Sequence, residues 1–367
     1  MRSFRLATQV RLGAEGLTAL DQFRDERVLL VTDGFLRTTP VFEQVLSRLG
    51  EHVTVFDDIV PNPTVATVSR GVASYMRCRP DVVVAYGGGS VIDTAKAMHK
   101  TTLVAGEAAR HGLVAIPTTS GSGSEVTSFA VITDEESHTK IPLSSPDMVA
   151  RLAILDPDAV VGVPPTITAD SGMDVLTHAI EAYVARDACD FSDAFAEKAV
   201  ELVFAHLTQC YRHGDDVDAR SRMHNASCMA AMAFDNAGLG ITHSLAHALG
   251  GHFAIAHGRL NAMLLPHVIA FNADHCERTA RRYALLGRLV TPSASGRAAV
   301  TALTVGVGRL LDALDMPQTL RQAGVEAAEV RPLLSELAET ALADSCTAPN
   351  PVAPGVDDLI SLLRRIL

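Results

Sequence analysis

Five short apolar runs in the first half of the chain constrain the fold more than any other feature of the sequence. They lie at residues 27–32, 52–56, 81–86, 113–116 and 152–155, and Asp, Pro or Gly bounds them. Such runs are typical of buried strands, and the helical patterns between them indicate alternating strands and helices. We therefore expect a parallel sheet, and so an α/β fold, in the first half.

The strand signal ends at the Val163-Pro164-Pro165 break, after which helical windows at residues 194–207, 220–233 and 356–367 take over. A chain of 367 residues that is 48% hydrophobic has enough apolar material for two cores. We expect an α/β domain over residues 1–163 and an all-helical domain over residues 164–367. A ligand site is expected in the cleft between them.

Charge and cysteine content narrow the classes of partner. The net charge of −11 argues against nucleic acid and anionic membranes, which both attract basic clusters. Six scattered cysteines without a CxxC pair fit a reducing cytoplasm, and no apolar stretch is long enough for a bilayer span or a signal peptide. Small molecules are the partners that the composition favours.

Acidic and imidazole side chains gather in two segments of the second half. Asp174 and His178 are four residues apart in a helical pattern, so they share a face, although a core Asp–His pair explains these two equally well. Five of the 14 histidines fall within residues 243–267, in an apolar, glycine-punctuated stretch that packing alone explains poorly. Together the two segments indicate a site for a divalent metal.

The ligand set of this site contains no sulfur. One carboxylate, Asp174, with three imidazoles, His178, His243 and His257, suits Fe(II) or Zn(II). His247 lies one helical turn from His243 and is interpreted as a proton carrier rather than a ligand. Simple packing of His247 remains the alternative.

A glycine-rich turn indicates an anion site in the first half. Gly87-Gly-Gly-Ser90 directly follows an apolar strand and opens a helix, where backbone N–H groups can hold a phosphate, and Ser90 and Asp93 have the spacing of a capping box. Asp33 ends the first strong strand, where a carboxylate accepts hydrogen bonds from a ribose and repels a 2′-phosphate. This favours NAD over NADP, although Asp33 can also belong to a simple turn and the nearby Arg37 keeps NADP open.

Five motifs in the chain resemble those of the iron-containing (group III) alcohol dehydrogenase family. They are GGGSVIDTAK, PTTSGSGSEVT, GMDVLTHAIEAY, GLGITHSLAHALGG and HGRLNAMLLPHV. The resemblance runs over essentially the whole chain. It implies NAD(H) and a metal, Fe(II) first and Zn(II) as the alternative. It implies Asp174, His178, His243 and His257 as ligands, His247 beside the nicotinamide, and contacts to the dinucleotide from Asp33, Asn62, Gly88, Gly89, Ser90, Thr118, Thr119 and Lys140.

Within this family, the segments VTDGFLRTTP, SDAFAEKAVELVF and RMHNASCMAAMAF most resemble those of members that interconvert propanal and 1-propanol in propanediol-utilisation microcompartments. The resemblance places Phe129, Phe234 and Cys346 at the substrate pocket, whose two Phe rings suit a short aliphatic chain. It also implies a homo-oligomer, with a microcompartment shell as a further partner. Another short-chain alcohol dehydrogenase or a lactaldehyde reductase remains open, and so do two further classes: a metal- and NAD-dependent lyase resembling dehydroquinate synthases, and a non-catalytic sensor.

Overall fold

The chain forms two compact units in the computed structural model, which describes residues 3–135 and 139–367. The sheet unit comprises Arg5–Val163 and Asp215–Ala231. The helical unit comprises Pro164–Gly214 and Met232–Leu367, together with Ser3 and Phe4. The segment Asp215–Ala231 thus groups with the sheet, although its sequence pattern is helical.

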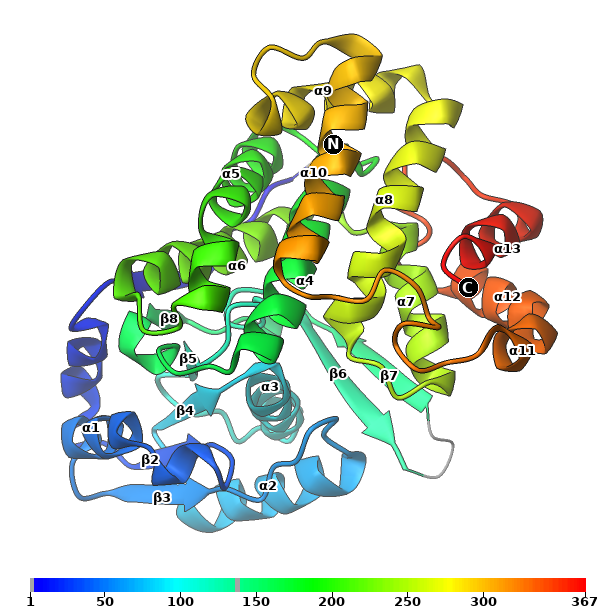
Figure 1. The fold of residues 1–367 in the computed structure, drawn as a ribbon. Coiled ribbons are helices and arrows are strands. Elements are labelled where there is room, and N and C mark those ends of the chain that lie inside the picture. The colour runs from blue at the N-terminus through cyan, green and yellow to red at the C-terminus, as the bar shows by residue number, and fades with distance from the viewer. Residues whose placement is uncertain (1–2, 136–138) are drawn as a thin grey trace. The chain divides into compact units, whose positions relative to one another are not determined.

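A six-stranded parallel sheet forms the centre of the sheet unit, and five of its strands correspond to the five apolar runs (Figure 1). The strand order is β1-β8-β5-β4-β2-β3. The strands are β1 (Gln9–Leu12), β2 (Val28–Val31), β3 (Val53–Phe56), β4 (Val82–Gly87), β5 (Leu113–Pro117) and β8 (Leu152–Leu155). Alternate residues of β2 and β4 enter two different core clusters, so both faces of the sheet are buried.

Three α-helices connect the strands, and local sequence sets where they begin. They are α1 (Pro40–Leu49), α2 (Val65–Cys78) and α3 (Gly89–Val104). Thr39 accepts a hydrogen bond from the Phe42 amide and is followed by Pro40, while Thr64 accepts from the Thr67 amide, so both threonines act as N-caps. Short 3₁₀ helices complete the unit at Gly16–Phe23, Leu36–Thr38, Pro146–Met148 and Pro157–Ala159.

An antiparallel hairpin that the sequence patterns do not predict also belongs to the sheet unit. It consists of β6 (Phe129–Asp134) and β7 (Thr139–Ser144) (Figure 1). Two side chains of α3 hold it. The buried Lys96 donates from Nζ to the carbonyls of Thr127 and Phe129 at 2.7 and 2.8 Å, and Asp93 accepts from the Val131 amide at 2.9 Å.

The chain contains no strand between residues 164 and 367, all of which the structure describes, so the predicted change of fold class is confirmed. Its helices are α4 (Pro165–Val184), α5 (Asp190–Arg212), α6 (Val217–Ala237), which begins in the sheet unit, α7 (Ile241–His252), α8 (His257–His275), α9 (Glu277–Val290), α10 (Gly296–Ala313), α11 (Ala327–Val330), α12 (Leu334–Ala343) and α13 (Val356–Arg364), with a 3₁₀ turn at Arg331–Leu333. Helix α8 packs against both α4 and α7 (Figure 1). A core of leucines joins α7 to α8, α12 and α13.

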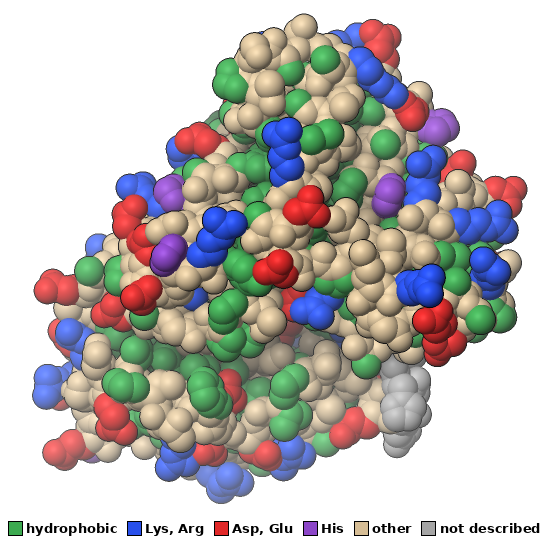
Figure 2. Space-filling view, viewed as in Figure 1, with side chains coloured by type: hydrophobic (Ala, Val, Ile, Leu, Met, Phe, Trp, Pro, Cys, Tyr) green, Lys and Arg blue, Asp and Glu red, His purple; other side chains and the backbone are tan. Residues whose placement is uncertain are grey.

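The distribution of exposed charged side chains bears on the expectation that the chain does not bind nucleic acid or anionic membranes. Lys and Arg side chains alternate with Asp and Glu over the face shown in Figure 2, without a broad basic patch on that face. Among the described residues, none of the helices combines the length and the apolar character needed to cross a membrane.

Candidate metal centre and cofactor loops

Four predicted ligands converge on one point of the helical unit. Helix α4 carries Asp174 and His178, α7 carries His243, and His257 is the first residue of α8. Asp174 Oδ1 lies 3.9 Å from Nε2 of His178 and 3.6 Å from Nε2 of both His243 and His257. Two ligand atoms bound to one tetrahedral Zn(II) at 2.0–2.2 Å lie ~3.4 Å apart, so these separations fit a shared cation after small adjustments.

The surroundings leave the rings of His178 and His257 ready to bind a metal. The carboxylates of Asp174 and Glu181, in contrast, outweigh burial and raise the pKa of His243 to about 9, so a metal must displace a proton from His243. Asp174, His178 and His243 are buried, and the imidazoles of His178 and His243 stack with their centroids 4.7 Å apart. Burial lowers the pKa of His178 to about 4 and also lowers that of His257, which leaves both rings neutral with a free lone pair. The pKa of Asp174 is lowered despite its burial, because the imidazoles around it, the protonated His243 among them, favour its charged form. The carboxylate is therefore ionised.

Asn261 is a buried neighbour of the ligands that the sequence analysis missed. It lies one turn after His257 in α8, and its Nδ2 donates to Asp174 Oδ1 at 2.8 Å. The same nitrogen is 3.2 Å from His243 Nε2 and 3.1 Å from His257 Nε2. The i,i+4 spacing from a predicted ligand is the signal that points to it.

The start of α8 is fixed against α4 by an ion pair and by close backbone contact. Arg259 donates to both carboxylate oxygens of Asp170, each at 3.0 Å, in a two-pronged geometry that is stronger than a single contact. A Cβ added to Gly258 would lie 1.9 Å from the Asp170 carbonyl oxygen, so only glycine fits at this crossing. These contacts position His257, which directly precedes Gly258.

A second missed residue, Glu181, contacts the ligand on α7. Its carboxylate accepts hydrogen bonds from His243 Nδ1 at 2.6 Å, from the Thr242 amide at 2.7 Å and from the Gly240 amide at 2.9 Å. Burial alone would raise the pKa of Glu181, but these donors outweigh it and lower the pKa. Glu181 follows Asp174 by seven residues, so it lies on the ligand face of α4.

His247 lies beside the ligands without joining their contacts to Asp174. Its ring stacks on that of His257 with centroids 5.1 Å apart, and its side chain is 37% exposed. Asp344 Oδ2 lies 2.9 Å from His247 Nδ1. Although burial opposes it, this contact lowers the pKa of Asp344 to about 2. An ionised carboxylate can only accept, so it holds the proton on Nδ1 and leaves Nε2 for proton exchange.

Two of the three predicted substrate-pocket residues lie at this centre. Phe234 packs on His178 with ring centroids 4.5 Å apart. Cys346 groups with His247 and Asp344, their nearest donor atoms lying within 4.8 Å of one another. Phe129 begins β6 in the sheet unit and is 40% exposed. Their role in binding a substrate stays a prediction.

Most predicted dinucleotide contacts follow the carboxyl ends of neighbouring strands. Asp33 follows β2, Asn62 lies in the loop after β3, Gly88 follows β4 and Thr118 follows β5. Because these strands are parallel, the residues lie at one edge of the sheet, where open α/β sheets bind ligands. Asn62 is exposed with a left-handed φ of 58°.

The glycine-rich turn and the loop after β5 lie side by side. The Thr118 amide donates to the Gly87 carbonyl at 3.1 Å, and the Thr119 hydroxyl is the group nearest to the missing side chain of Gly88. Gly88 is the N-cap of α3, and the first turn of that helix, which contains Gly89 and Ser90, has no acidic residue. The amino end of α3 therefore suits an anion such as a pyrophosphate.

Three details of the cofactor end differ from expectation or add to it. The predicted capping box of Ser90 and Asp93 is wrong. The Asp93 carboxylate instead accepts hydrogen bonds from Ser124 Oγ at 2.6 Å and from the Val131 amide of the hairpin. Asp33 Oδ1 accepts from the Phe35 and Leu36 amides at 2.9 and 2.8 Å, so it also stabilises its own turn. Lys140 lies on β7, exposed and in register with Thr133 of β6.

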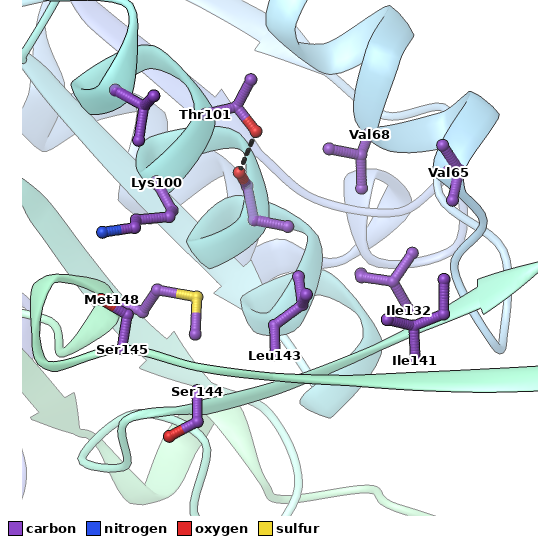
Figure 3. Close-up of a pocket in the computed structure, with 12 residues that line it drawn as sticks. Val65, Val68, Lys100, Thr101, Ile132, Ile141, Leu143, Ser144, Ser145 and Met148 are labelled. Atoms are coloured by element: carbon purple, nitrogen blue, oxygen red, sulfur yellow. Dashed lines mark hydrogen bonds between the residues drawn. The ribbon is translucent and has the colours of Figure 1, made fainter.

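A separate cavity of about 460 Å³ lies in the sheet unit between α2, α3 and the hairpin (Figure 3). Aliphatic side chains such as Val68, Ile132 and Leu143 line it, and the hydroxyl of Thr101 turns away to the carbonyl of Ala97. None of the predicted cofactor, metal or substrate residues lines this cavity. It is therefore distinct from the candidate site.

Comparison with known proteins identifies the family of this chain. A family model described as iron-containing alcohol dehydrogenase matches residues 7–157, and the C-terminal model of the Fe-containing alcohol dehydrogenase family matches residues 168–367. The 1-propanol dehydrogenase PduQ of Citrobacter freundii is 42% identical, with the whole of both chains covered. The NAD-dependent methanol dehydrogenase of Bacillus methanolicus is 36% identical over 95% of this chain and 94% of the relative.

A solved structure agrees with this assignment. The crystal structure of a 1,3-propanediol oxidoreductase superposes with a TM-score of 0.93 at 31% sequence identity, again with all of both chains covered. The two family models together span nearly the whole chain. The chain therefore belongs to the iron-containing alcohol dehydrogenase family and is an enzyme of the alcohol dehydrogenase class.

Proposed function

We propose that this enzyme uses NAD(H) and one divalent metal to interconvert a short aliphatic aldehyde and its primary alcohol, with propanal and 1-propanol as the preferred pair. The observation that carries the proposal is the convergence of three imidazole nitrogens within 3.9 Å of one carboxylate oxygen, Asp174 Oδ1. The sulfur-free donor set fits Fe(II) first and Zn(II) as the alternative. The identity to a 1-propanol dehydrogenase supports the substrate.

The metal ligands would be Asp174, His178, His243 and His257. When bound there, the cation would supply a Lewis acid that polarises the aldehyde oxygen and stabilises the negative charge that develops on it. His247 would deliver the proton that the product oxygen needs, since its Nδ1 is held by Asp344 and its Nε2 remains available. Phe234 would supply an apolar wall beside His178.

The dinucleotide would bind in the sheet unit. The amino end of α3 at Gly88, Gly89 and Ser90, with the hydroxyls of Thr118 and Thr119, would hold the pyrophosphate. Asp33, Asn62 and Lys140 would contact the rest of the cofactor, and Asp33 would favour NAD by repelling a 2′-phosphate. Identity to an NAD-dependent relative supports this choice. The Asp and His side chains of the helical unit can exchange protons but cannot transfer a hydride, which the nicotinamide would supply when bound.

A lyase acting on a phosphorylated acid receives no support from the helical unit. Such an enzyme needs free cationic side chains in its substrate pocket, and Arg259, the cationic side chain nearest in sequence to the predicted ligands, is paired with Asp170.

The proposal also includes the assembly and the location of the enzyme. We propose a homo-oligomer in the cytoplasm, inside a microcompartment and in contact with its shell. The likeness to PduQ alone supports this part.

The function is tested on enzyme purified anaerobically, stripped with a chelator and reloaded separately with Fe(II) or Zn(II). NADH oxidation is then measured with C2 to C4 aldehydes and lactaldehyde, and NADPH is compared on the best of them. We expect metal-dependent turnover with propanal as the preferred substrate. Preference for lactaldehyde would reject the propanal assignment, and binding of NADH and metal without turnover would indicate a sensor. Full activity of a His243→Ala or His257→Ala variant without bound metal would reject the ligand set.

A further inference from the structure

One carboxylate connects the two helices that hold three of the four proposed ligands. Glu181 is on α4 together with Asp174 and His178, while its three hydrogen-bond donors belong to the start of α7. Two of these donors are the amides of Gly240 and Thr242, which have no partner within α7 because they precede or open the helix. The third donor is the imidazole of His243. Glu181 is only 3% exposed, so water does not compete for these bonds.

The bond to His243 decides which ring nitrogen carries the proton. A carboxylate 2.6 Å from Nδ1 requires the proton to lie on Nδ1. Once the ring is neutral, as metal binding requires, the lone pair is on Nε2, the atom that faces Asp174 Oδ1 at 3.6 Å. In the opposite tautomer Nε2 would carry the proton and could not bind a cation. Partners of this kind orient metal-binding histidines and raise their basicity.

The backbone around Glu181 fits this carboxylate closely. A Cβ added to Gly240 would lie 2.7 Å from Glu181 Oε1 and 2.8 Å from Asn350 Oδ1, so glycine is the residue that lets both groups approach. Asn350 in turn faces the Ile241 amide at 3.4 Å. The start of α7 is thus built around Glu181, and the ring of His243 has little freedom to turn.

We propose that Glu181 is a positioning residue of the metal centre, which fixes the tautomer and orientation of His243 so that Nε2 is presented to the cation. This inference rests on the proposed ligand set. It assigns to Glu181 no contact with substrate or cofactor. It predicts that the affinity for metal depends on the charge of Glu181, and not only on the stability of the helical unit.

The substitution Glu181→Gln separates these two contributions because it keeps the size of the side chain. A glutamine has one accepting oxygen for three N–H donors, and its own NH₂ group would face one of those donors. The His243 ring would lose its acceptor or adopt the other tautomer. We expect the dissociation constant for Zn(II) to rise about 10- to 100-fold, the usual effect of losing such a partner. The visible absorption bands of the Co(II)-loaded protein should also change.

The matched control is Leu337→Ala, which opens a cavity in the core that α12 forms with α7 and α8 but leaves the partners of His243 in place. Zn(II) affinity is measured on the full chain by competition with a chromophoric chelator. We expect Leu337→Ala to lose stability with an unchanged dissociation constant. Equal metal affinity of Glu181→Gln and the unsubstituted enzyme would overturn the proposal, and so would an equal loss of affinity in the control.

Two further variants make the outcome decisive. His243→Ala should bind Zn(II) worst of all; if it binds as well as the unsubstituted enzyme, the ligand set fails and the role of Glu181 fails with it. If the unsubstituted enzyme binds metal and His243→Ala does not, an unchanged Glu181→Gln refutes the positioning role alone. Should Glu181→Gln not fold, Gly240→Ala displaces the carboxylate without removing it, and the same loss of affinity is expected. Unchanged affinity in that variant would overturn the proposal.

Discussion

Replacing Gly258 by alanine tests how tightly the start of α8 is fixed at the proposed metal centre. The added Cβ would lie 1.9 Å from the carbonyl oxygen of Asp170 and 2.7 Å from its carbon. Ordinary contacts between carbon atoms are ~3.5–4.0 Å, so the contact with the Asp170 carbon alone requires α8 to move away from α4 by about 1 Å. The neighbouring His257 must move with it, while the ion pair of Arg259 with Asp170 opposes the movement.

We expect Gly258→Ala to lose about 1–3 kcal/mol of unfolding free energy, the range typical of overpacked sites. Because a ligand is displaced, we also expect Zn(II) affinity to fall at least about tenfold. Chemical denaturation and chelator competition measure the two effects. Gly251→Ala is the matched control, since a Cβ there meets no atom within 4 Å. A Gly258→Ala enzyme that is as stable as the unsubstituted enzyme and binds metal as tightly would refute the reasoning.

Three other predictions concern single side chains. Burial raises the pKa of Glu125 from 4.5 to about 7, so the protonated form stabilises the fold fully below pH 4.5 and this contribution disappears as pH rises through 7. Chemical denaturation at pH values across this range should show that the free energy of unfolding falls by on the order of 3 kcal/mol in the unsubstituted enzyme but not in Glu125→Gln. An equal dependence on pH in both proteins would contradict this prediction. Asp33→Ala should raise the rate with NADPH relative to NADH, and an unchanged ratio would count against its ribose contact. Asp344→Ala should lower kcat about tenfold or more with metal content unchanged, because it frees His247 and no ligand; an unaltered kcat would argue against proton delivery by His247.

Local patterns predicted the sheet, and they also suggested the candidate ligand pairs, because both depend on short spacings. The apolar runs predicted five of the six parallel strands to within a residue or two, and the i,i+4 pairs of α4 and α7 are local properties of a helix. The hairpin of β6 and β7 was missed because apolar side chains such as Phe129 and Val131 are exposed on it, while Ala130 and Ile132 are buried. Its sequence is therefore apolar on both faces and lacks the polar–apolar alternation that is typical of a strand buried on one face.

At the candidate site, contacts between residues that are far apart in the sequence could not be predicted. Asp344 contacts His247 although the two residues are 97 positions apart in the sequence, and no spacing in the sequence indicates this pairing. Asp93 had the position of a capping residue, yet a tertiary contact with Ser124 and the hairpin determines its orientation. Glu181 is the exception, because its i+7 position after Asp174 already places it on the ligand face of α4.

Anomalous diffraction from crystals of the enzyme loaded with Fe(II) or Zn(II) tests the central claim most directly. The account predicts one strong peak per chain, coordinated by an oxygen of Asp174 and by Nε2 of His178, His243 and His257. A peak coordinated instead by His247, Asp344 and Cys346, the other group of potential ligand atoms among the described residues, would contradict it. A fully active enzyme without any peak would contradict it as well.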